Sequence, residues 1–394
     1  MASVPDVAAA AAPEQRRLLN VNVGVLGHVD SGKTALVAAL STLLSTAALD
    51  KHPQSKERGI TLDLGFSSFS LGSMPPHLAH LPYDELQFTL VDCPGHASLI
   101  RTIIGGMHIM DTMLLVIDIT KGLQAQTAEC LVVAEVATPS MIVVLNKIDQ
   151  LPEQDRAKTI RKAAKRLAQT LQMTKFAAAP MIPVAAKPGG GGPPEGIDAL
   201  KSLLVASVPP TLRTVSAAPF LMAIDHCFMV KGQGTVMTGT LLRGSVSVGQ
   251  VVELPELKLQ RPVRSIQAFR RPVTSAQQGD RVGVCVAQLD PTLIERGIAA
   301  APGTLPTFSV AIAAVEKVRF YASHVTTGER VHINVGHSTV MAEVTAIGTP
   351  DGTGVPAEMA VSSLVESMAR LSVDAAPEPF AMGSEYLAQL WKSR

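Results

Sequence analysis

An eight-residue stretch directly after a β-branched apolar run constrains this chain more than any other feature. Residues 27–34, Gly-His-Val-Asp-Ser-Gly-Lys-Thr, fit the pattern G-x-x-x-x-G-K-[ST] and follow the predicted strand Val21–Leu26. In such a loop the glycines let backbone N–H groups surround a β-phosphate, the lysine reaches the β and γ oxygens, and the threonine hydroxyl ligates Mg²⁺. The apolar residues that follow have helical spacing: Leu36, Leu40, Leu43 and Ala47. The sequence therefore predicts a phosphate-binding loop formed by Gly27, His28, Val29, Asp30, Ser31, Gly32, Lys33 and Thr34.

Short apolar runs alternate with helical patterns through about residue 208. The runs predicted to be buried strands are Val21–Leu26, Phe88–Val91, Met113–Asp118, Met141–Asn146 and Met181–Ala186. This alternation predicts an α/β P-loop domain with a mostly parallel sheet and helices on both faces, in which ligands bind at the carboxyl ends of the strands. Leu71 to Gln87 contains three prolines and reads as a surface insertion.

The pattern changes after Pro219 to short alternating strands separated by glycines. The predicted strands are Phe220–Asp225, Gly234–Leu242, Gln250–Leu254, Val263–Ala268 and Arg281–Val286. Regular turns at this spacing predict an antiparallel β-barrel. Two further runs, Phe308–Tyr321 and Val331–Val344, predict the start of a second, incomplete β-barrel.

These patterns divide the chain of 394 residues into four parts. We expect a loose tail over 1–17, a nucleotide-binding P-loop domain over 18–212, a barrel over 213–304, and a partial second barrel over 305–394 that is poorly defined after 348. The net charge of +1 makes no global argument for nucleic acid, so any RNA contact must come from local basic faces. Four widely spaced cysteines disfavour a zinc site or a disulfide framework and favour a reducing cytoplasm. No apolar run approaches the length of a membrane span.

Three further motifs follow predicted strands and complete a guanine-nucleotide site. Asp92 and Gly95 lie in Asp-Cys-Pro-Gly-His, where a P-loop protein places the carboxylate of the Mg²⁺ shell and the N–H that senses the γ-phosphate. Asn146-Lys147-Ile148-Asp149 selects the base, because the Asp149 carboxylate can accept both the ring N–H and the exocyclic amine of guanine, and adenine offers no matching donors. The third element supplies a backbone N–H to the guanine oxygen and consists of Ala185, Ala186 and Lys187. The predicted ligands are therefore GTP and Mg²⁺.

Two residues are candidates for sensing and hydrolysing the γ-phosphate. Thr61, in the polar segment 50–61, is the candidate to ligate Mg²⁺ in the GTP state, against the alternative of an ordinary threonine in a solvated loop. His96 is the candidate to orient the attacking water, against a structural role before an apolar helix. Its adjacency to Gly95 favours the catalytic interpretation.

Several strings of this sequence are recognisable together: GHVDSGKT, ERGIT, DCPGH and NKID. They resemble translational GTPases, the family of elongation factor Tu. Longer strings, from about Leu19 to about Gly336, look like the eukaryotic selenocysteine-specific elongation factors, among them ERGITLDLGFSSF and DHCFMVKGQGTVMTGT. The resemblance implies a monomeric GTPase that delivers selenocysteinyl-tRNA to the ribosome at UGA codons.

The same resemblance implies an aminoacyl pocket in the first barrel, formed by Asp225, His226 and Arg281. A selenol is more acidic than a serine hydroxyl, so it is anionic at neutral pH and an arginine with a histidine can hold it. Two basic stretches are candidates for tRNA phosphates, one on the helix predicted over Arg156–Arg166 and one flanking a barrel strand, from Lys258 to Arg271. We give the second more weight because it is closer to the pocket.

The chain departs from the family near its C-terminus. Family members continue through a complete third domain and a fourth that engages the protein recognising the selenocysteine insertion element, whereas this chain ends at Arg394. We expect the third domain to be about half built and residues 348–394 to match the family poorly, which puts recruitment of that partner in doubt. Two alternatives stay open: another translational GTPase, or a truncated GTP- or tRNA-binding protein without delivery activity.

Overall fold

The computed structural model places a large part of the chain. The described residues are 17–41, 43–44, 65–93, 108–210, 218–269, 271–294, 296–306, 311, 313, 315, 325–335, 338–345 and 390–391. Within this part of the chain, no helix has the length and apolar character needed to cross a membrane.

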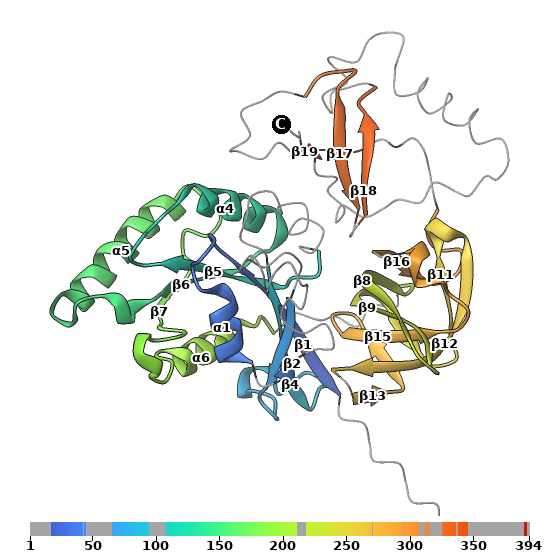
Figure 1. The fold of residues 1–394 in the computed structure, drawn as a ribbon, viewed down its shortest axis with the longest axis horizontal. Coiled ribbons are helices and arrows are strands. Elements are labelled where there is room, and N and C mark those ends of the chain that lie inside the picture. Colours follow the sequence, from blue (N-terminus) through green and yellow to red (C-terminus); the bar gives the residue numbers. More distant parts are fainter. Residues whose placement is uncertain are drawn as a thin grey trace, which may run out of the picture.

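The N-terminal domain is built on a seven-stranded sheet in the order β2-β3-β4-β1-β5-β6-β7 (Figure 1). Its strands are β1 (Leu18–Leu26), β2 (Leu43–Leu44), β3 (Gly65–Ser70), β4 (Glu85–Asp92), β5 (Thr112–Asp118), β6 (Met141–Asn146) and β7 (Met181–Pro183). Strands β4, β1, β5, β6 and β7 run parallel, and β2 and β3 extend the sheet antiparallel beyond β4. The mostly parallel sheet predicted from the alternating pattern is confirmed. The carboxyl ends of the parallel strands lie at one edge of the sheet, where the predicted motifs follow them.

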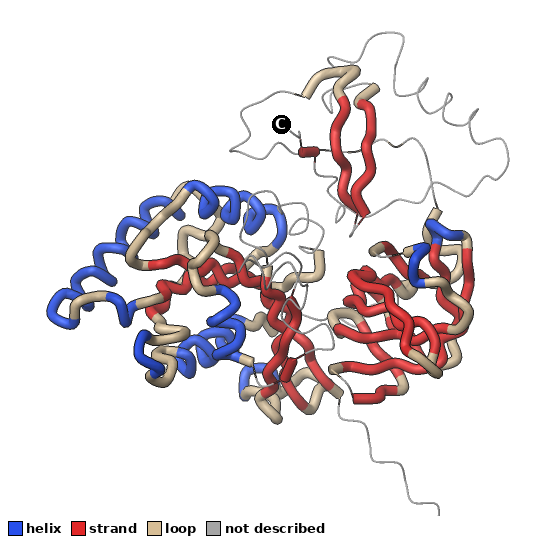
Figure 2. The backbone as a smooth tube through the Cα atoms, in the orientation of Figure 1, coloured by secondary structure: helices blue, strands red, loops and turns tan. Residues whose placement is uncertain are grey.

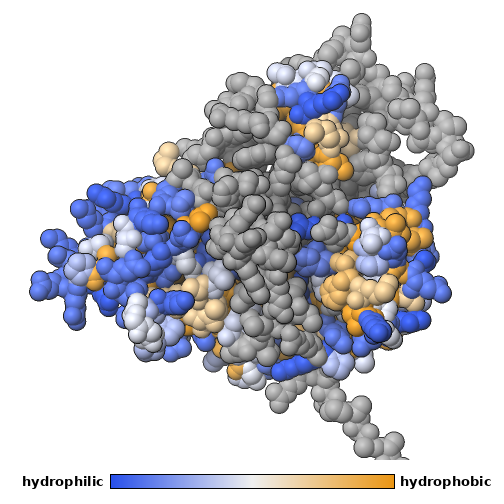
Figure 3. Space-filling model, in the orientation of Figure 1, coloured by the Kyte–Doolittle hydropathy of each residue, from blue (hydrophilic) through white to orange (hydrophobic). Residues whose placement is uncertain are grey.

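Helices cover both faces of this sheet (Figure 2). On one face, α4 (Ala125–Ala137) and α5 (Arg156–Leu171) pack into a core shared with β5 and β6. On the other, α1 (Lys33–Leu40) and α6 (Ile197–Ser207) bury their leucines against β1 and β4. Helix α5 keeps a strongly charged outer face, and the surface on that side of the molecule is coloured hydrophilic in Figure 3.

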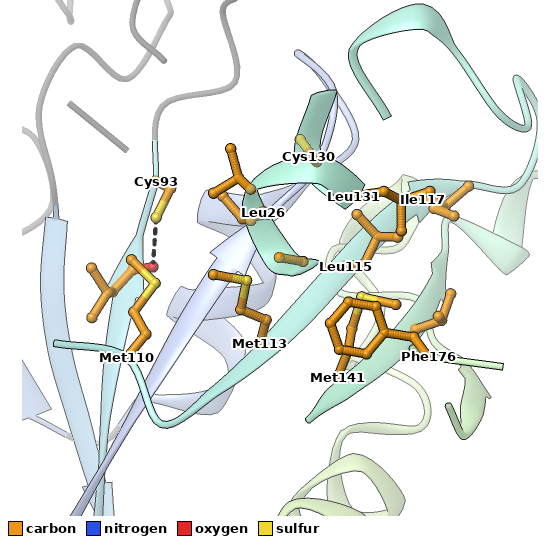
Figure 4. Close-up of a cluster of buried hydrophobic side chains, with 14 of the residues drawn as sticks. Leu26, Cys93, Met110, Met113, Leu115, Ile117, Cys130, Leu131, Met141 and Phe176 are labelled. Carbon is orange, nitrogen blue, oxygen red and sulfur yellow. Dashed lines mark hydrogen bonds between the residues drawn. The ribbon is translucent and has the colours of Figure 1, made fainter. Parts of the chain in front are cut away.

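The core between the sheet and α4 is tightly packed (Figure 4). A Cβ at Gly24 of β1 would lie 2.2 Å from the Met110 sulfur, so Met110 packs directly on the strand backbone. Cys93 follows β4 with its thiol 3.6 Å from the Val91 carbonyl oxygen. Burial raises the pKa of Cys93 far above its ordinary value, and burial raises the pKa of Cys130 to about 11, so both thiols stay protonated at neutral pH.

Helix α1 ends earlier than its apolar spacing predicts. The expected continuation through Leu43 is wrong, because Ser41 adopts an extended conformation with its hydroxyl on the Val37 carbonyl, and Leu43 pairs with Ser68 as part of β2. Ala47 lies outside the described residues. Strand β7 also ends three residues before the predicted limit of Ala186, since Ala185 leaves the sheet to exchange hydrogen bonds with Glu195.

The predicted surface insertion Leu71–Gln87 is correct for residues 71–84, which join β3 to β4, and wrong for 85–87, which begin β4 with Leu86 and Gln87 buried. The connection contains the short 3₁₀ helix η1 (Pro76–Leu78), and its Leu78 side chain is fully buried against the core of α1 and α6. This segment is therefore anchored to the domain.

The barrel that follows closes through six strands in the order β11-β16-β8-β9-β15-β12, with β12 pairing back to β11. Its elements are β8 (Leu221–Val230), β9 (Gly234–Arg243), β11 (Val251–Leu254), β12 (Leu259–Ala268), β15 (Arg281–Val286) and β16 (Gly297–Ala300). Short strands β13 (Arg271–Val273), β10 (Ser245–Ser247) and β14 (Ser275–Gln277) are added at the periphery. The predicted barrel is confirmed, although the closing strand β16 was missed because its Gly-Ile-Ala-Ala sequence carries no alternation.

A third, smaller sheet has the order β18-β17-β19. Strands β17 (Arg330–Val335) and β18 (Ser338–Glu343) form a hairpin within the predicted run Val331–Val344, and β19 (Leu390–Trp391) pairs with β17. Most of the other predicted run, Phe308–Tyr321, lies outside the described residues.

The N-terminal domain and the barrel meet through buried polar and apolar contacts. The side-chain amides of Asn20 and Asn22 on β1 both donate to the carbonyl oxygen of Gly279, at 2.7 and 2.9 Å. Ala223 of β8 belongs to the same buried apolar cluster as the β5 and α4 side chains. Hydrogen bonds from two buried asparagines to one carbonyl set the position of the turn that leads into β15.

Candidate functional site

The phosphate-binding loop connects β1 to α1 and adopts a conformation that only glycine supports at two positions. Gly27 has φ 153° and Gly32 has φ 92°. A Cβ at Gly27 would lie 2.3 Å from the Val116 carbonyl oxygen, and one at Gly32 would lie 2.3 Å from the Asn146 amide nitrogen. The loop is therefore folded tightly against β5 and β6, and a larger residue at either position would push it out of place.

Lys33 lies beneath this loop. Its ammonium group donates to the carbonyl oxygens of Gly27 at 3.0 Å and His28 at 2.9 Å, and the side chain is buried. Burial lowers the pKa of Lys33, and the nearby Asp92 carboxylate acts in the opposite direction. A buried ammonium held by two neutral carbonyls is poised to exchange them for phosphate oxygens, which are stronger acceptors.

Ser31 provides a further test of whether phosphate fits the loop. Its side chain is 1% exposed, and its hydroxyl has no hydrogen-bond partner within the residues that the structure describes. The Nδ1 atom of His28 is likewise buried without a partner in that part of the chain. Unsatisfied buried polar atoms are uncommon in native folds, so this loop fits a polar ligand.

The residues predicted to hold Mg²⁺ lie together at the same edge of the sheet. The Thr34 hydroxyl donates to the Asp92 carboxylate at 2.7 Å, joining the start of α1 to the end of β4. A hydroxyl and a carboxylate are hard oxygen donors of the kind Mg²⁺ accepts, together with water and phosphate oxygens. The pair therefore fits the ion.

Asn146 connects the phosphate-binding loop to the predicted base-binding elements. Its amide nitrogen donates to the Ser31 carbonyl at 2.9 Å, and its amide oxygen accepts from the Ala186 N–H at 3.1 Å. One buried side chain at the end of β6 thus holds two loops in register. This is a structural role for Asn146 that its motif alone does not specify.

The other base-binding candidates surround this point. Asp149 accepts a hydrogen bond from the Gly189 N–H at 3.0 Å and is half-buried, so its carboxylate is fixed while it retains acceptor capacity for a base. Lys147 has a left-handed backbone, with φ 67°. Ala185 and Ala186 are buried, and Lys187 is exposed. The structure brings these residues to one loop cluster, and their contacts with guanine remain predictions.

Asp118 was missed at the sequence level although it ends the predicted strand Met113–Asp118. Its carboxylate accepts from the Lys147 ammonium at 2.8 Å and from the backbone N–H and hydroxyl of Thr120 at 3.0 and 2.6 Å. Burial opposes its ionisation, but these hydrogen bonds outweigh burial and lower the pKa of Asp118. An ionised Asp118 therefore anchors Lys147. The available signal was a carboxylate at the carboxyl end of a central strand.

Three candidates lie outside the described residues: Thr61, Gly95 and His96. Their roles in γ-phosphate sensing and water positioning stay predictions.

Two of the three predicted barrel residues form a buried ion pair. Asp225 is at a bulge in β8 and Arg281 begins β15, and their side chains are 3% and 5% exposed. The Arg281 guanidinium donates to one carboxylate oxygen of Asp225, and the Thr238 hydroxyl donates to the other at 2.8 Å. His226 follows on β8 and is half-buried.

The pair faces the N-terminal domain. The guanidinium carbon of Arg281 lies 3.1 Å from the centroid of the Phe66 ring, which is fully buried on β3. Stacking covers a face of the guanidinium, and its N–H groups lie in the plane of that group. Neither Phe66 nor Thr238 was identified from the sequence, because Phe66 acts through Arg281 of the other domain and Thr238 acts through Asp225 on the neighbouring strand.

The two basic stretches are placed on different domains. Lys158, Arg161, Lys162, Lys165 and Arg166 are exposed along α5, far from the barrel in Figure 1. On the barrel, Lys258, Arg264 and Arg271 are exposed, whereas Arg261 bonds the carbonyls of Gln260 and Gln288. Arg270 lies outside the described residues.

Comparisons with known proteins match this arrangement. Residues 19–227, more than half of the chain, match the family model of the elongation factor Tu GTP-binding domain. The chain belongs to this family. Residues 312–380 match the third domain of eukaryotic selenocysteine-specific elongation factors. The expectation that family likeness fades from residue 348 onwards is therefore wrong for 348–380, where a domain model detects similarity that lacks an obvious motif.

Relatives of this elongation factor family cover most of the chain. The selenocysteine-specific elongation factor of Mus musculus is 56% identical over 333 residues, which is 82% of this chain and 56% of the relative. The factor of the same description from Methanocaldococcus jannaschii is 38% identical over 328 residues, 82% of this chain and 66% of the relative. The chain thus spans less than two thirds of the length of these curated relatives.

Solved structures agree with the fold. Elongation factor SelB from Methanococcus maripaludis, in complex with the GTP analogue GppNHp, is similar with a TM-score of 0.67 and 31% identity, covering 83% of this chain and 65% of that one. A bacterial selenocysteine-specific elongation factor gives a TM-score of 0.70 at 24% identity, covering 85% and 52%, and supports the fold alone. The expected architecture, a P-loop domain followed by an antiparallel barrel, is that of these elongation factors.

Proposed function

We propose that this chain is a GTP-hydrolysing elongation factor that binds selenocysteinyl-tRNA and delivers it to the ribosome at UGA codons. The observation that carries the proposal is the buried Asp225–Arg281 pair on the barrel face that meets the N-terminal domain. A phosphate-binding loop in the elongation factor Tu domain and 56% identity to the mouse factor support the same function.

The N-terminal domain has the groups needed to bind GTP. The backbone of the loop between Gly27 and Thr34 surrounds the phosphates, and the Lys33 ammonium exchanges its carbonyl partners for phosphate oxygens. Asp149 accepts from guanine while Asn146 holds the base loop against the phosphate loop. Thr34, Asp92 and Thr61 would hold Mg²⁺, which when bound neutralises phosphate charge. His96 orients the attacking water.

The barrel residues favour an anionic side chain. Arg281 keeps N–H donors at its edge, and charge-assisted hydrogen bonds to a selenolate are stronger than those to the neutral serine hydroxyl. His226 follows Asp225 in the sequence, and its imidazole is the second donor to the selenocysteine side chain. The exposed cations of β12 and β13 provide a surface for tRNA phosphates, and those of α5 provide a separate basic face.

The remaining partners and the setting follow from this function. We propose that the chain is a cytoplasmic monomer that acts on the ribosome and does not bind a membrane. Binding of the protein that recognises the selenocysteine insertion element belongs, in the family, to a fourth domain, and the described residues assign no surface to it.

The deciding experiment measures protection of the aminoacyl ester by the GTP-loaded chain. We expect slower hydrolysis of selenocysteinyl-tRNA than of seryl-tRNA, and loss of this difference in Arg281→Ala. The control Arg264→Ala removes an exposed arginine of the proposed tRNA-phosphate surface, so it should lower protection of both esters alike and keep the difference between them. Equal protection of selenocysteinyl-, seryl- and methionyl-tRNA would favour another translational GTPase. If the chain binds GTP but ribosomes do not raise its hydrolysis above the background rate, a binding protein without delivery activity would be favoured.

A further inference from the structure

The buried Asp225–Arg281 pair has a third member on the neighbouring strand β9. Thr238 is 5% exposed, and its hydroxyl donates to Oδ1 of Asp225 at 2.8 Å, while Arg281 NH1 donates to Oδ2. The partner of Thr238 on β15 is Gly283, two residues after Arg281. A Cβ placed at Gly283 would lie 3.2 Å from the Val236 side chain and 3.8 Å from the Thr238 methyl group, so the methyl side of the threonine is in close-packed surroundings.

Arg281 uses few of its hydrogen-bond donors. Within the part of the chain that the structure describes, NH1 makes the hydrogen bond that Arg281 donates, and its partner is one oxygen of Asp225. The preferred geometry of an arginine–carboxylate pair is bidentate, with both oxygens on two guanidinium nitrogens. Here one oxygen is held by Thr238, so the pair is monodentate.

This geometry leaves donors for a ligand. Phe66 covers a face of the guanidinium, and guanidinium N–H groups point outward in its plane. If Asp225 turned to bind through both oxygens, it would occupy a second nitrogen and place more negative charge where a selenolate must bind. Restraining the carboxylate therefore preserves the part of Arg281 that recognises an anion.

We infer that Thr238 is a positioning residue for selenocysteine selectivity: its hydroxyl restrains Asp225 to a one-oxygen pair with Arg281 and keeps guanidinium donors free for the selenolate. This inference rests on the proposed function. It assigns the selectivity of the pocket to a residue that contacts the carboxylate rather than the ligand.

The test compares ester protection of selenocysteinyl-tRNA and seryl-tRNA by the full GTP-loaded chain. Thr238→Val removes the hydroxyl at nearly constant volume and should weaken binding of selenocysteinyl-tRNA about tenfold, the size of one hydrogen bond to a charged group, with seryl-tRNA and GTP binding unchanged. Thr238→Ser restores the hydroxyl and should restore selectivity. The matched control is Thr240→Val, because Thr240 is two residues further on the same strand, 2% exposed, and its hydroxyl has no partner among the described residues.

The outcomes separate this inference from the proposed function. Selectivity in the wild-type chain that persists in Thr238→Val would overturn the inference alone, as would an equal loss in Thr240→Val, which would indicate a general packing effect. Equal protection of both esters by the wild-type chain would overturn the proposed function together with the inference. If the valine variant does not fold, Thr238→Ala tests the same hydroxyl with a smaller side chain.

Discussion

The buried ion pair of the barrel leads to a stability prediction that is independent of any ligand. Asp225→Ala leaves the Arg281 guanidinium charged in a site where its side chain is 5% exposed, with no carboxylate on its NH1 group. Breaking a buried pair by removing one partner costs about 3–5 kcal/mol, since the remaining charge is desolvated and uncompensated. Removing both charges avoids that penalty. We therefore expect Asp225→Ala to destabilise the barrel by about 3–5 kcal/mol, and the double variant Asp225→Ala/Arg281→Met to recover most of the loss.

Hydrogen exchange measured by mass spectrometry is the suitable assay, because it reports the opening free energy of β8, β9 and β15 separately from the other domain. The control Asp290→Ala removes an exposed carboxylate of the same barrel that accepts hydrogen bonds from Thr292, two residues further along the chain, and its effect should be much smaller. A loss below about 1 kcal/mol in Asp225→Ala would refute the reasoning. So would a double variant no more stable than the single one.

Three further predictions concern the N-terminal domain. Gly32→Ala should abolish GTP binding, because the new Cβ would lie 2.3 Å from the Asn146 amide nitrogen in a backbone with φ 92°. Fluorescent-nucleotide titration measures the loss, the circular dichroism spectrum should stay unchanged, and retained affinity would show that the loop adapts. Asp149→Asn should lower affinity for GTP at least tenfold and raise affinity for xanthosine triphosphate, since the substitution replaces a carboxylate oxygen that accepts from the base with an amide group that donates to it. An unchanged preference for GTP over xanthosine triphosphate would place the base elsewhere. The pKa of Asp118 is lowered in the folded state, so its ion pair with Lys147 stabilises the fold above the unfolded pKa near 4, and this stability is lost as pH falls through the folded pKa. In urea denaturation between about pH 5 and 2, the free energy of unfolding should therefore fall less steeply with acid in Asp118→Asn than in the wild-type chain, and parallel curves would contradict this.

Local chemistry explains why the loops that carry the predicted nucleotide site could be placed from the sequence. Each motif is a contiguous string with a fixed backbone task, such as the positive φ of Gly32, and each follows an apolar strand. Element ends were less predictable. The helix after the loop ended at Leu40 because pairing of Leu43 with Ser68 took precedence over helical spacing. Strand β16 was missed because two alanines and a glycine give no apolar alternation, yet it closes the barrel.

Functional signals that depend on a distant partner were less visible. Asp118 had a recognisable position at a strand end, but its role depends on Lys147, which follows the next strand. Resemblance indicated Asp225 and Arg281, together with His226, as pocket residues, and their sequence context alone suggested only solvated strand ends. Their burial follows from the packing of the barrel against β3.

By itself the sequence determined the P-loop domain and the change to antiparallel strands, and it predicted guanine over adenine, because these depend on residue types at short, fixed spacings. Only the tertiary structure decided how the two domains act together. Asn20 and Asn22 stand in a central strand, where polar residues look misplaced, until Gly279 is seen to accept from both across more than 250 residues of chain. Phe66 and Thr238 likewise acquire their roles from Arg281 and Asp225. Such contacts are set by strand register and domain docking, which bring together residues that no local pattern connects.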